Sequence, residues 1–132
     1  MVLRKTKNHY ICVIGLGYVG LPLAIAFSEK FKTIAYDTNT QRIKDLKQGI
    51  DKTLEIDKPS LDKVKNNITF TNNIEKTQNC NFYVVTVPTP IDKSNKPDLS
   101  PLLRASKTVG SVLDEGDIVV FESTVYPGVT EE

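Results

Sequence analysis

The sequence predicts an α/β domain with a doubly wound parallel sheet, and three observations support this fold class. Short runs rich in β-branched residues alternate with longer stretches of helical periodicity, as in sheets whose parallel strands are joined by helices. The first run, Tyr10 to Ile14, leads directly into a glycine-rich segment and then a helical pattern. The second run, Thr33 to Tyr36, is followed by the acidic residue Asp37. Together these features are typical of a Rossmann-type fold with helices on both faces of the sheet.

The helices are placed by apolar periodicity and by the residues that begin them. The pattern predicts one helix over Tyr18 to Lys30 and a second over Thr40 to Gln48. Ser60 is the predicted cap of a short third helix, because its hydroxyl can accept a hydrogen bond from the first turn. Ser100 is the predicted cap of a fourth helix, and Pro101 then takes the first position, where a missing N–H group costs nothing.

The remaining strands are expected at Ile68 to Phe70, Asn81 to Val87 and Asp117 to Glu122. The segment Pro88-Thr89-Pro90 should stop the fourth strand, because a proline cannot donate to a strand ladder. Residues Ser123 to Gly128 should form a turn beyond the fifth strand. Right-handed crossover connections then place the strands in the order 3-2-1-4-5.

The composition is that of one globular domain, and the charge of the chain excludes some partners. Hydrophobic residues make up 39% and charged residues 25% of the 132 residues, which suffices for a single buried core. Seventeen basic and sixteen acidic side chains leave a formal charge of +1. Because no strong global field results, we expect neither nucleic acid nor a membrane as a partner, and an anionic ligand must be bound locally.

The two cysteines do not form a metal or redox motif. Cys12 lies in an apolar run, Cys80 is distant in the sequence, and His9 is the one further soft ligand. We therefore expect two plain buried or half-buried thiols and no metal site. This cysteine content does not require an oxidising compartment, and we expect a cytoplasmic protein.

The N-terminal region has some features of a signal peptide or a membrane span. Arg4, Lys5 and Lys7 precede an uncharged stretch from Tyr10 to Ser28. Three glycines and Pro22 interrupt that stretch, however, where a spanning helix would be more uniformly apolar. We therefore interpret the stretch as a buried strand, a turn and a helix of a folded domain.

The segment Gly15-Leu16-Gly17-Tyr18-Val19-Gly20 is the strongest indication of function. It joins a predicted strand to a predicted helix, the context in which the pattern G-x-G-x-x-G binds the pyrophosphate of a dinucleotide. Gly15 permits the tight turn, Gly17 lets the backbone approach the pyrophosphate, and Gly20 lets the helix pack against the strand. The free N–H groups and the dipole of the helix then meet the phosphate charge. The alternative is a glycine-rich turn that binds no ligand.

Asp37, at the end of the second strand, is the candidate for binding the adenosine ribose. A carboxylate at this place accepts hydrogen bonds from ribose hydroxyls and repels the 2′-phosphate of NADP, so NAD is the expected cofactor. Arg42 follows in the next predicted helix, and its positive charge could accommodate the 2′-phosphate of NADP, which allows some binding of NADP as well. The alternative is that Asp37 is an ordinary turn or helix-capping residue.

Two further loops should reach the same site. The ligand of an open α/β sheet lies across the carboxyl ends of the strands, which nominates Thr86 to Pro90 after the fourth strand and Ser123 with Thr124 after the fifth. Hydroxyl groups there can offer oriented hydrogen bonds, and prolines can line a nicotinamide ribose closely. Simple turn chemistry is the alternative for both loops.

Several stretches of the chain are similar to those of one known family. They are Gly15 to Pro22, Asp37, Arg42, Val87-Pro88-Thr89-Pro90 and Glu122 to Gly128, together with Gly49 to Glu55 and Pro97 to Leu102. On these residues essentially the whole chain resembles the N-terminal domain of the UDP-glucose/GDP-mannose dehydrogenase family. The last two stretches, and Pro88 in place of a more usual asparagine, resemble bacterial enzymes that act on UDP-N-acetylhexosamines. Glu122 to Gly128 is the most diagnostic stretch, since the glycine loop occurs in many folds.

The resemblance implies a bacterial NAD-dependent oxidoreductase of capsule or O-antigen polysaccharide synthesis. Such enzymes oxidise the C6 alcohol of a UDP-sugar to a carboxylate with two NAD+, through a thiohemiacetal and a thioester. The resemblance assigns the pyrophosphate to Gly15 to Gly20, the adenosine end to Asp37 and Arg42, and the nicotinamide side to Val87 to Pro90. Thr124 would help to position water near the reacting centre.

The resemblance also implies what this chain lacks. The nucleophilic cysteine, the lysine and the asparagine of the family lie in later domains, and neither Cys12 nor Cys80 matches the cysteine motif. We expect residues 1–132 to be an NAD-binding fragment that is inactive alone, without the central dimerisation domain and the C-terminal UDP-sugar domain. The full-length enzyme is expected to be a homodimer or a higher homo-oligomer.

Two other functions are compatible with the residues. One is a non-catalytic NAD(H)-sensing module, in which cofactor binding alters an interaction surface. The other is a different nicotinamide dehydrogenase, or a methyltransferase that uses Asp37 to bind another ribose. The stretch from Glu122 to Gly128 argues against this second alternative.

Overall fold

The central sheet contains five parallel strands in the order β3-β2-β1-β4-β6. The computed structural model describes residues 10–89, 93–122 and 124–125. The order confirms the predicted 3-2-1-4-5 arrangement, because β6 is the fifth strand of this sheet. β1 lies between β2 and β4, so the segment that follows it emerges at the centre of the carboxyl edge. The strands are β1 (Tyr10–Ile14), β2 (Lys32–Tyr36), β3 (Ile68–Thr71), β4 (Phe82–Val85) and β6 (Ile118–Phe121).

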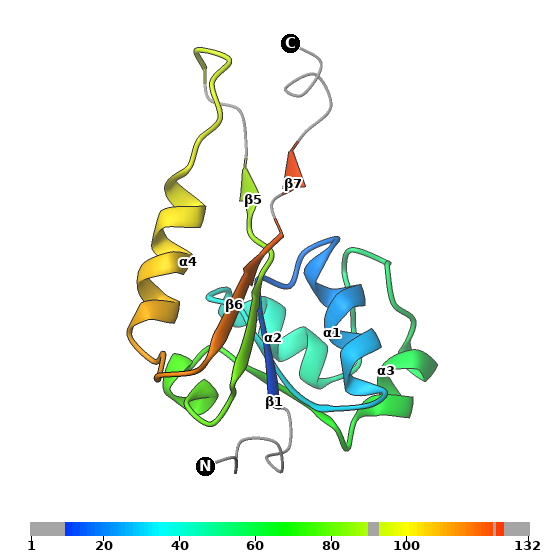
Figure 1. The fold of residues 1–132 in the computed structure, drawn as a ribbon. Helices are drawn as coiled ribbons and strands as arrows, with labels where there is room; N and C mark the ends of the chain where they lie inside the picture. The colour runs from blue at the N-terminus through cyan, green and yellow to red at the C-terminus, as the bar shows by residue number, and fades with distance from the viewer. Residues whose placement is uncertain (1–9, 90–92, 123, 126–132) are drawn as a thin grey trace.

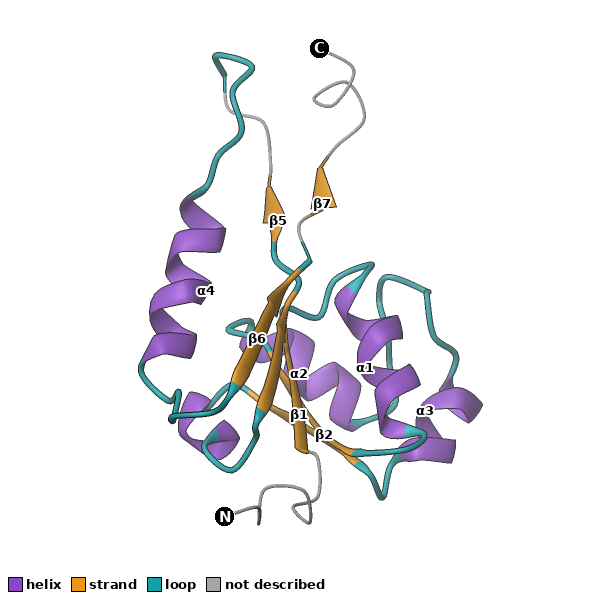
Figure 2. Ribbon diagram, in the orientation of Figure 1, coloured by secondary structure: helices purple, strands orange, loops and turns teal. Residues whose placement is uncertain are grey.

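Helices cover both faces of the sheet, which confirms the predicted fold class. α1 and α3 lie on one side and α4 on the other (Figure 1), with the strands between them (Figure 2). Within the described residues, no helix combines the length and the apolar character needed to cross a membrane. The helices are α1 (Gly20–Ser28), α2 (Thr40–Lys47), α3 (Lys58–Val64), the short 3-10 helix η2 (Ile74–Thr77) and α4 (Ser100–Gly110).

Two apolar layers lie on opposite faces of the sheet, because successive residues of a strand point to opposite sides. In β1, Ile11 and Val13 pack in the cluster that contains the buried apolar residues of α1, α2 and α3. Cys12 and Ile14 pack in the cluster beneath α4. All four are at most 4% exposed. A strand that is apolar on both faces needs cover on both, which explains the three-layer architecture.

The helix starts differ from the predicted caps. Asp57, not Ser60, caps α3, and its carboxylate accepts a hydrogen bond from the Ser60 N–H at 3.0 Å. α4 begins at Ser100 itself, where Asp98 accepts a hydrogen bond from the Ser100 N–H at 3.0 Å, so Pro101 is the second residue of the helix. In both cases a carboxylate lies slightly earlier in the chain, and an ionised group is the stronger acceptor for free N–H groups.

The first helix is shorter than predicted at both ends. α1 covers Gly20–Ser28 rather than Tyr18 to Lys30. At its end the chain turns, and the N–H groups of Lys30 and Phe31 both donate to the carbonyl of Phe27. This turn brings the chain directly into β2.

The loops after β4 and β6 form a small sheet that the sequence did not predict. β5 (Pro88–Thr89) and β7 (Thr124–Val125) pair in parallel, Pro88 with Thr124 and Thr89 with Val125, and they lie side by side above the main sheet (Figure 1). The predicted extension of β4 to Val87 is wrong, since β4 ends at Val85. The predicted turn is wrong at Thr124 and Val125, and its other residues lie outside the described ones. The pairing joins two loops that meet only in the folded chain.

Both cysteines are buried free thiols, as predicted. A hydrogen bond between the Cys12 and Cys80 side chains, together with burial, raises the pKa of Cys12 well above its ordinary value. Because the thiolate is the reactive form of cysteine, Cys12 is a poor nucleophile.

Candidate cofactor site

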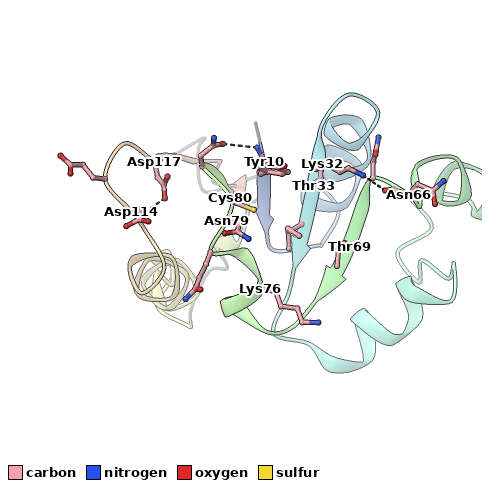
Figure 3. Close-up of a pocket in the computed structure, with 15 residues that line it drawn as sticks. Tyr10, Lys32, Thr33, Asn66, Thr69, Lys76, Asn79, Cys80, Asp114 and Asp117 are labelled. Carbon is pink, nitrogen blue, oxygen red and sulfur yellow. Dashed lines mark hydrogen bonds between the residues drawn. The ribbon is translucent and has the colours of Figure 1, made fainter. Parts of the chain in front are cut away.

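Two cavities among the described residues lie at opposite ends of the strands of the sheet. The larger, about 770 Å³, lies at the amino ends of the strands, where Tyr10, Lys32 and Asp117 line it (Figure 3). The other, about 620 Å³, lies at the carboxyl ends beside the glycine loop. Ligands of open α/β sheets bind at the carboxyl ends, where loops and helix amino termini converge. The smaller cavity, which we call the cleft, is therefore the candidate site.

The glycine loop borders the cleft, and two of its three glycines have no room for a side chain. Gly15 has a φ of +96°, in the left-handed region that favours glycine, and its N–H donates to the carbonyl of Tyr36 at 2.9 Å. A Cβ added to Gly20 would collide with the carbonyl oxygen of Gly15 and with Thr86 Oγ1. A Cβ added to Gly17 would meet no atom within 4 Å. Gly15 and Gly20 are therefore required by the fold, whereas Gly17 borders open space.

Thr86 joins the end of β4 to the glycine loop. Its hydroxyl donates to the carbonyl of Gly15 at 2.7 Å, with the carbonyl of Ile14 at 3.2 Å, and its N–H donates to the carbonyl of Ile14 at 2.8 Å. Thr86 is buried, although it borders the cleft. This residue, which the sequence nominated with the loop after β4, holds the glycine loop in place by its hydroxyl group.

Asp37 lies directly after β2 and lines the cleft. One carboxylate oxygen accepts a hydrogen bond from the Leu16 N–H at 2.8 Å, and the other accepts one from the Asn39 N–H at 2.9 Å. The Asn39 side chain in turn caps α2 by accepting a hydrogen bond from the Arg42 N–H at 3.0 Å. Each carboxylate oxygen can accept a second hydrogen bond. Asp37 thus connects β2, the glycine loop and α2 and keeps acceptor capacity for ribose hydroxyls.

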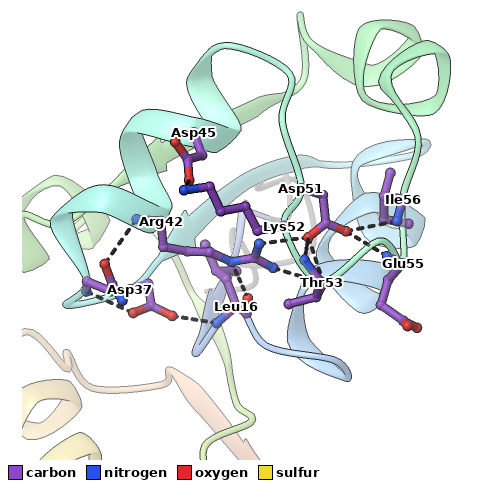
Figure 4. A network of polar contacts seen from close by, with 10 residues as sticks. Leu16, Asp37, Arg42, Asp45, Asp51, Lys52, Thr53, Glu55 and Ile56 are labelled. Atoms are coloured by element: carbon purple, nitrogen blue, oxygen red, sulfur yellow. Dashed lines mark hydrogen bonds and ion pairs between the residues drawn. The ribbon is translucent and has the colours of Figure 1, made fainter.

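Arg42 also lines the cleft, but protein groups occupy much of its guanidinium (Figure 4). Nε donates to the carbonyl of Leu16 at 2.8 Å, and Nη1 donates to Asp51 Oδ1 at 2.7 Å. Nη2 donates to Thr53 Oγ1 at 3.5 Å. Because arginine carries five N–H donors, these contacts leave some of them for a ligand. The predicted contact of Arg42 with the adenosine end stays a prediction.

Most of the predicted cofactor residues line this one cleft. Gly20 does not, because it is buried beneath the glycine loop. The backbones of Thr89 and Thr124 belong to β5 and β7, while their side chains and the whole of Pro90 lie outside the described residues. The predicted residues that line the cleft are Gly15, Leu16, Gly17, Tyr18, Val19, Asp37, Arg42, Val87 and Pro88.

The sequence pattern did not point to the wall that α4 contributes to the cleft. Pro101, Arg104 and Thr108 line this wall. Their spacing places them on one helix face, beside the buried stripe of Ala105 and Val109, and this spacing was the available signal. The other lining residues that were missed are Ile14, Tyr36, Thr38, Asn39, Thr53 and Ala105. Thr53 belongs to the stretch from Gly49 to Glu55 that supported the family resemblance, but it lies in the loop between α2 and α3, and no residue pattern placed it at the cleft.

The residues of the cleft fit a dinucleotide. Gly17 offers open backbone at the carboxyl end of the central strand, Asp37 offers a carboxylate after β2, and Arg104 brings a positive charge to the opposite wall. Backbone N–H groups and a cation suit a pyrophosphate, and the carboxylate suits a ribose. The doubly wound sheet and this cleft therefore define a dinucleotide-binding domain.

Comparison with known proteins identifies the family within this class. The model of the UDP-glucose/GDP-mannose dehydrogenase family, NAD binding domain, matches residues 9–132. The chain belongs to this family as its NAD-binding domain, and NAD is its cofactor.

Individual relatives agree with the family assignment. The chain is 53% identical over 126 residues to a UDP-N-acetyl-D-glucosamine 6-dehydrogenase of Pseudomonas aeruginosa, covering 96% of this chain and 30% of that protein. It is 54% identical over 122 residues to the enzyme of that name from Salmonella typhi, covering 92% of this chain and 28% of that protein. A solved UDP-D-ManNAc dehydrogenase from Pyrococcus horikoshii superposes with a TM-score of 0.82 at 38% identity, covering 92% of this chain and 30% of that chain. The chain thus spans less than a third of the length of these relatives.

Proposed function

We propose that this chain is the cofactor domain of an enzyme that oxidises the C6 alcohol of a UDP-N-acetylhexosamine to the uronate. The similarity to two UDP-N-acetyl-D-glucosamine 6-dehydrogenases, at 53% and 54% identity, supports this substrate class. The share of these relatives that the chain spans, 30% and 28%, supports a division of labour. This domain binds NAD, while a central dimerisation domain and a C-terminal domain of the full-length protein supply oligomer contacts and the sugar site.

Different residues of the cleft then bind different parts of the cofactor. The glycine loop from Gly15 to Gly20 receives the pyrophosphate, and the observation that carries this role is the open backbone at Gly17 beside a carboxylate that already binds the loop. Asp37 binds the adenosine ribose with Arg42 beside it. Val87, Pro88, Thr89 and Pro90 line the nicotinamide side, and Thr124 positions water. When bound, NAD accepts the hydride that leaves the substrate.

The cellular context follows from the same assignment. The full-length protein would be a homodimer or a higher homo-oligomer of the bacterial cytoplasm, where it would supply uronates for capsule or O-antigen polysaccharide. Similarity to the protein CapL of Staphylococcus aureus, at 55% identity over 126 residues, is compatible with this role. Deletion of the gene should then remove the uronate from the surface polysaccharide.

Replacing Asp37 by alanine should weaken NAD binding by about 10- to 100-fold, because charge-assisted hydrogen bonds to the ribose are lost. NADP binding should fall less, because the alanine also removes a repulsion from the 2′-phosphate. Titration calorimetry of the chain with NAD+, NADP+ and S-adenosylmethionine measures both effects. Asp114→Ala, an exposed residue at the opposite edge of the sheet, is the matched control. A wild-type chain that binds S-adenosylmethionine but no dinucleotide would overturn the proposal.

Replacing Arg104 by glutamine should weaken NAD binding by about threefold at low salt, since one exposed charge facing a pyrophosphate contributes less than about 1 kcal/mol. The difference from wild type should shrink as salt screens the attraction. Lys107→Gln removes an equal charge from the same helix but from a position outside the cleft. This variant should change neither the NAD affinity nor its dependence on salt. Equal losses in the two variants would mean that Arg104 acts only through the net charge.

A separate experiment tests whether this domain only binds NAD while the sugar site lies elsewhere in the full-length protein. The chain alone should bind NAD+ and reduce none of it with UDP-N-acetylglucosamine present, whereas the full-length protein should form NADH. Turnover by residues 1–132 alone would contradict the assignment of the sugar site to another domain.

A further inference from the structure

A series of polar contacts connects the loop after α2 to the backbone of Leu16 in the glycine loop (Figure 4). The Leu16 N–H donates to Asp37 at 2.8 Å, and the Leu16 carbonyl accepts a hydrogen bond from Arg42 Nε at 2.8 Å. Leu16 lies between Gly15, whose backbone requires a glycine, and Gly17, which borders open space. Side chains therefore hold both backbone polar groups of Leu16, the residue that precedes the expected pyrophosphate contact at Gly17.

Asp51 is the residue on which the Arg42 end of this series depends. Its Oδ1 accepts hydrogen bonds from Arg42 Nη1 at 2.7 Å, from the Thr53 hydroxyl at 2.6 Å and from the Thr53 N–H at 2.9 Å. Its Oδ2 accepts hydrogen bonds from the N–H groups of Glu55 and Ile56, each at 2.9 Å. One carboxylate thus folds the loop around itself, orients the guanidinium and brings Thr53 to the cleft.

The Asp51–Arg42 pair is ionised and largely buried. The Asp51 side chain is 0% exposed and the Arg42 side chain is 11% exposed. Burial alone would raise the pKa of Asp51, but hydrogen bonds from Thr53, Arg42 and the backbone outweigh it and lower this pKa to about 2. At neutral pH the carboxylate therefore always carries its negative charge against the guanidinium.

We propose that Asp51 is a positioning residue that sets the preference of this domain for NAD over NADP, by holding Arg42 against the Leu16 carbonyl and neutralising its charge. The proposal rests on the proposed function only in that the cleft binds a dinucleotide. A 2′-phosphate requires a cation near the adenosine ribose, and Arg42 is a cation that lines the cleft in the first turns of the helix after β2. Bound to Asp51, this arginine orders the glycine loop and offers little net charge to an additional phosphate.

The proposal predicts a change in cofactor preference rather than a uniform loss of binding. In Asp51→Asn the amide keeps the size of the side chain but removes the charge and turns one acceptor into a donor. NAD+ affinity should fall about tenfold, as expected for a loosened charge-assisted contact. NADP+ affinity should fall less or rise, so the ratio of the two dissociation constants should move toward NADP+ by at least about fivefold. Titration calorimetry with both cofactors measures this ratio.

Two further variants separate this role from general damage to the fold. Asp62→Asn makes the same chemical change at an exposed carboxylate of α3 and should leave the ratio unchanged. Arg42→Lys keeps the charge, but an ammonium group cannot reproduce the separate contacts of Nε and Nη1. This variant should fold and should also shift the ratio toward NADP+, and it provides the measurement if Asp51→Asn does not fold.

A double-mutant cycle tests whether Asp51 acts through Arg42. In an Arg42→Gln background, adding Asp51→Asn should change NAD+ affinity by less than about twofold, because the group that transmits the effect is already absent. The proposal is overturned if the losses of NAD+ affinity caused by Asp51→Asn and by Arg42→Gln are fully additive. It is also overturned if neither Asp51→Asn nor Arg42→Lys changes the ratio of the two dissociation constants. Either outcome leaves the NAD site intact. A wild-type chain that binds no dinucleotide overturns this proposal together with the proposed function, so the two failures are distinguishable.

Discussion

Gly20→Ala should both destabilise the domain and abolish measurable NAD binding. The added methyl group would collide with the carbonyl oxygen of Gly15 and with the hydroxyl of Thr86, which form the junction of β1, β4 and α1. The carbonyl belongs to backbone in a left-handed conformation and cannot move aside as a flexible side chain would, so α1 must shift. We expect a loss of about 3 kcal/mol or more in the free energy of unfolding, measured by urea denaturation.

Two other glycines provide matched controls. Gly110 ends α4, and a Cβ there would meet no atom within 4 Å. Gly110→Ala should therefore leave NAD binding unchanged and stabilise the domain slightly, by less than about 1 kcal/mol. Gly17→Ala should leave the free energy of unfolding near that of wild type but weaken NAD binding, since its methyl group enters space assigned to the pyrophosphate. If Gly20→Ala unfolds at the same urea concentration as wild type, the close packing of α1 against β1 is wrong.

Asp51→Ala should cost about 3 to 5 kcal/mol of stability, the usual result of removing one partner of a buried ion pair. The loss leaves Arg42 without its counter-charge and leaves the N–H groups of Thr53, Glu55 and Ile56 without their acceptor. Urea denaturation at pH 7 measures the loss. Asp62→Ala, whose carboxylate is half exposed and 3.9 Å from Lys58 Nζ, should cost less than about 1 kcal/mol.

The same carboxylate should contribute to acid sensitivity. Because folding lowers the pKa of Asp51 from 3.8 to about 2, its contribution is complete above about pH 5 and is lost as the pH falls toward 2. The difference corresponds to about 2 kcal/mol. Between pH 5 and pH 2 the wild type should therefore lose about 2 kcal/mol more stability than Asp51→Asn. If the free energy of unfolding depended on pH in the same way in both proteins, folding would not favour the ionised form of Asp51.

The elements that the sequence predicted well are those that local chemistry determines. The strand from Tyr10 to Ile14 is apolar at every position after the first, and such a run suits a central strand buried on both faces. The alternation of strands and helices, with right-handed crossovers, then leaves few possible sheet orders, and the observed order is the predicted one. The glycine spacing and the acid after the second strand likewise indicate a dinucleotide site, because both belong to short, local patterns.

Competition among several acceptors or donors was harder to predict. Ser60 and Ser100 are plausible caps in isolation, yet nearby aspartates bind the free N–H groups instead. Arg42 and Asp51 are distant enough in sequence that no periodicity pairs them, and only the fold of the loop after α2 brings Asp51 to the guanidinium. The same holds for β5 and β7, whose pairing depends on where β4 and β6 end.

By itself, the sequence therefore determined the fold class. It also predicted a dinucleotide site at the carboxyl ends of the strands and the residue types proposed to bind the pyrophosphate and the ribose. These properties depend on short-range patterns of apolar residues, glycines and charge. The tertiary structure decided which polar groups pair, including the contacts of Leu16 with Asp37 and Arg42 and the wall that α4 adds to the cleft. Such pairings join groups far apart in the chain, and their outcome depends on distances and burial that only the folded protein defines.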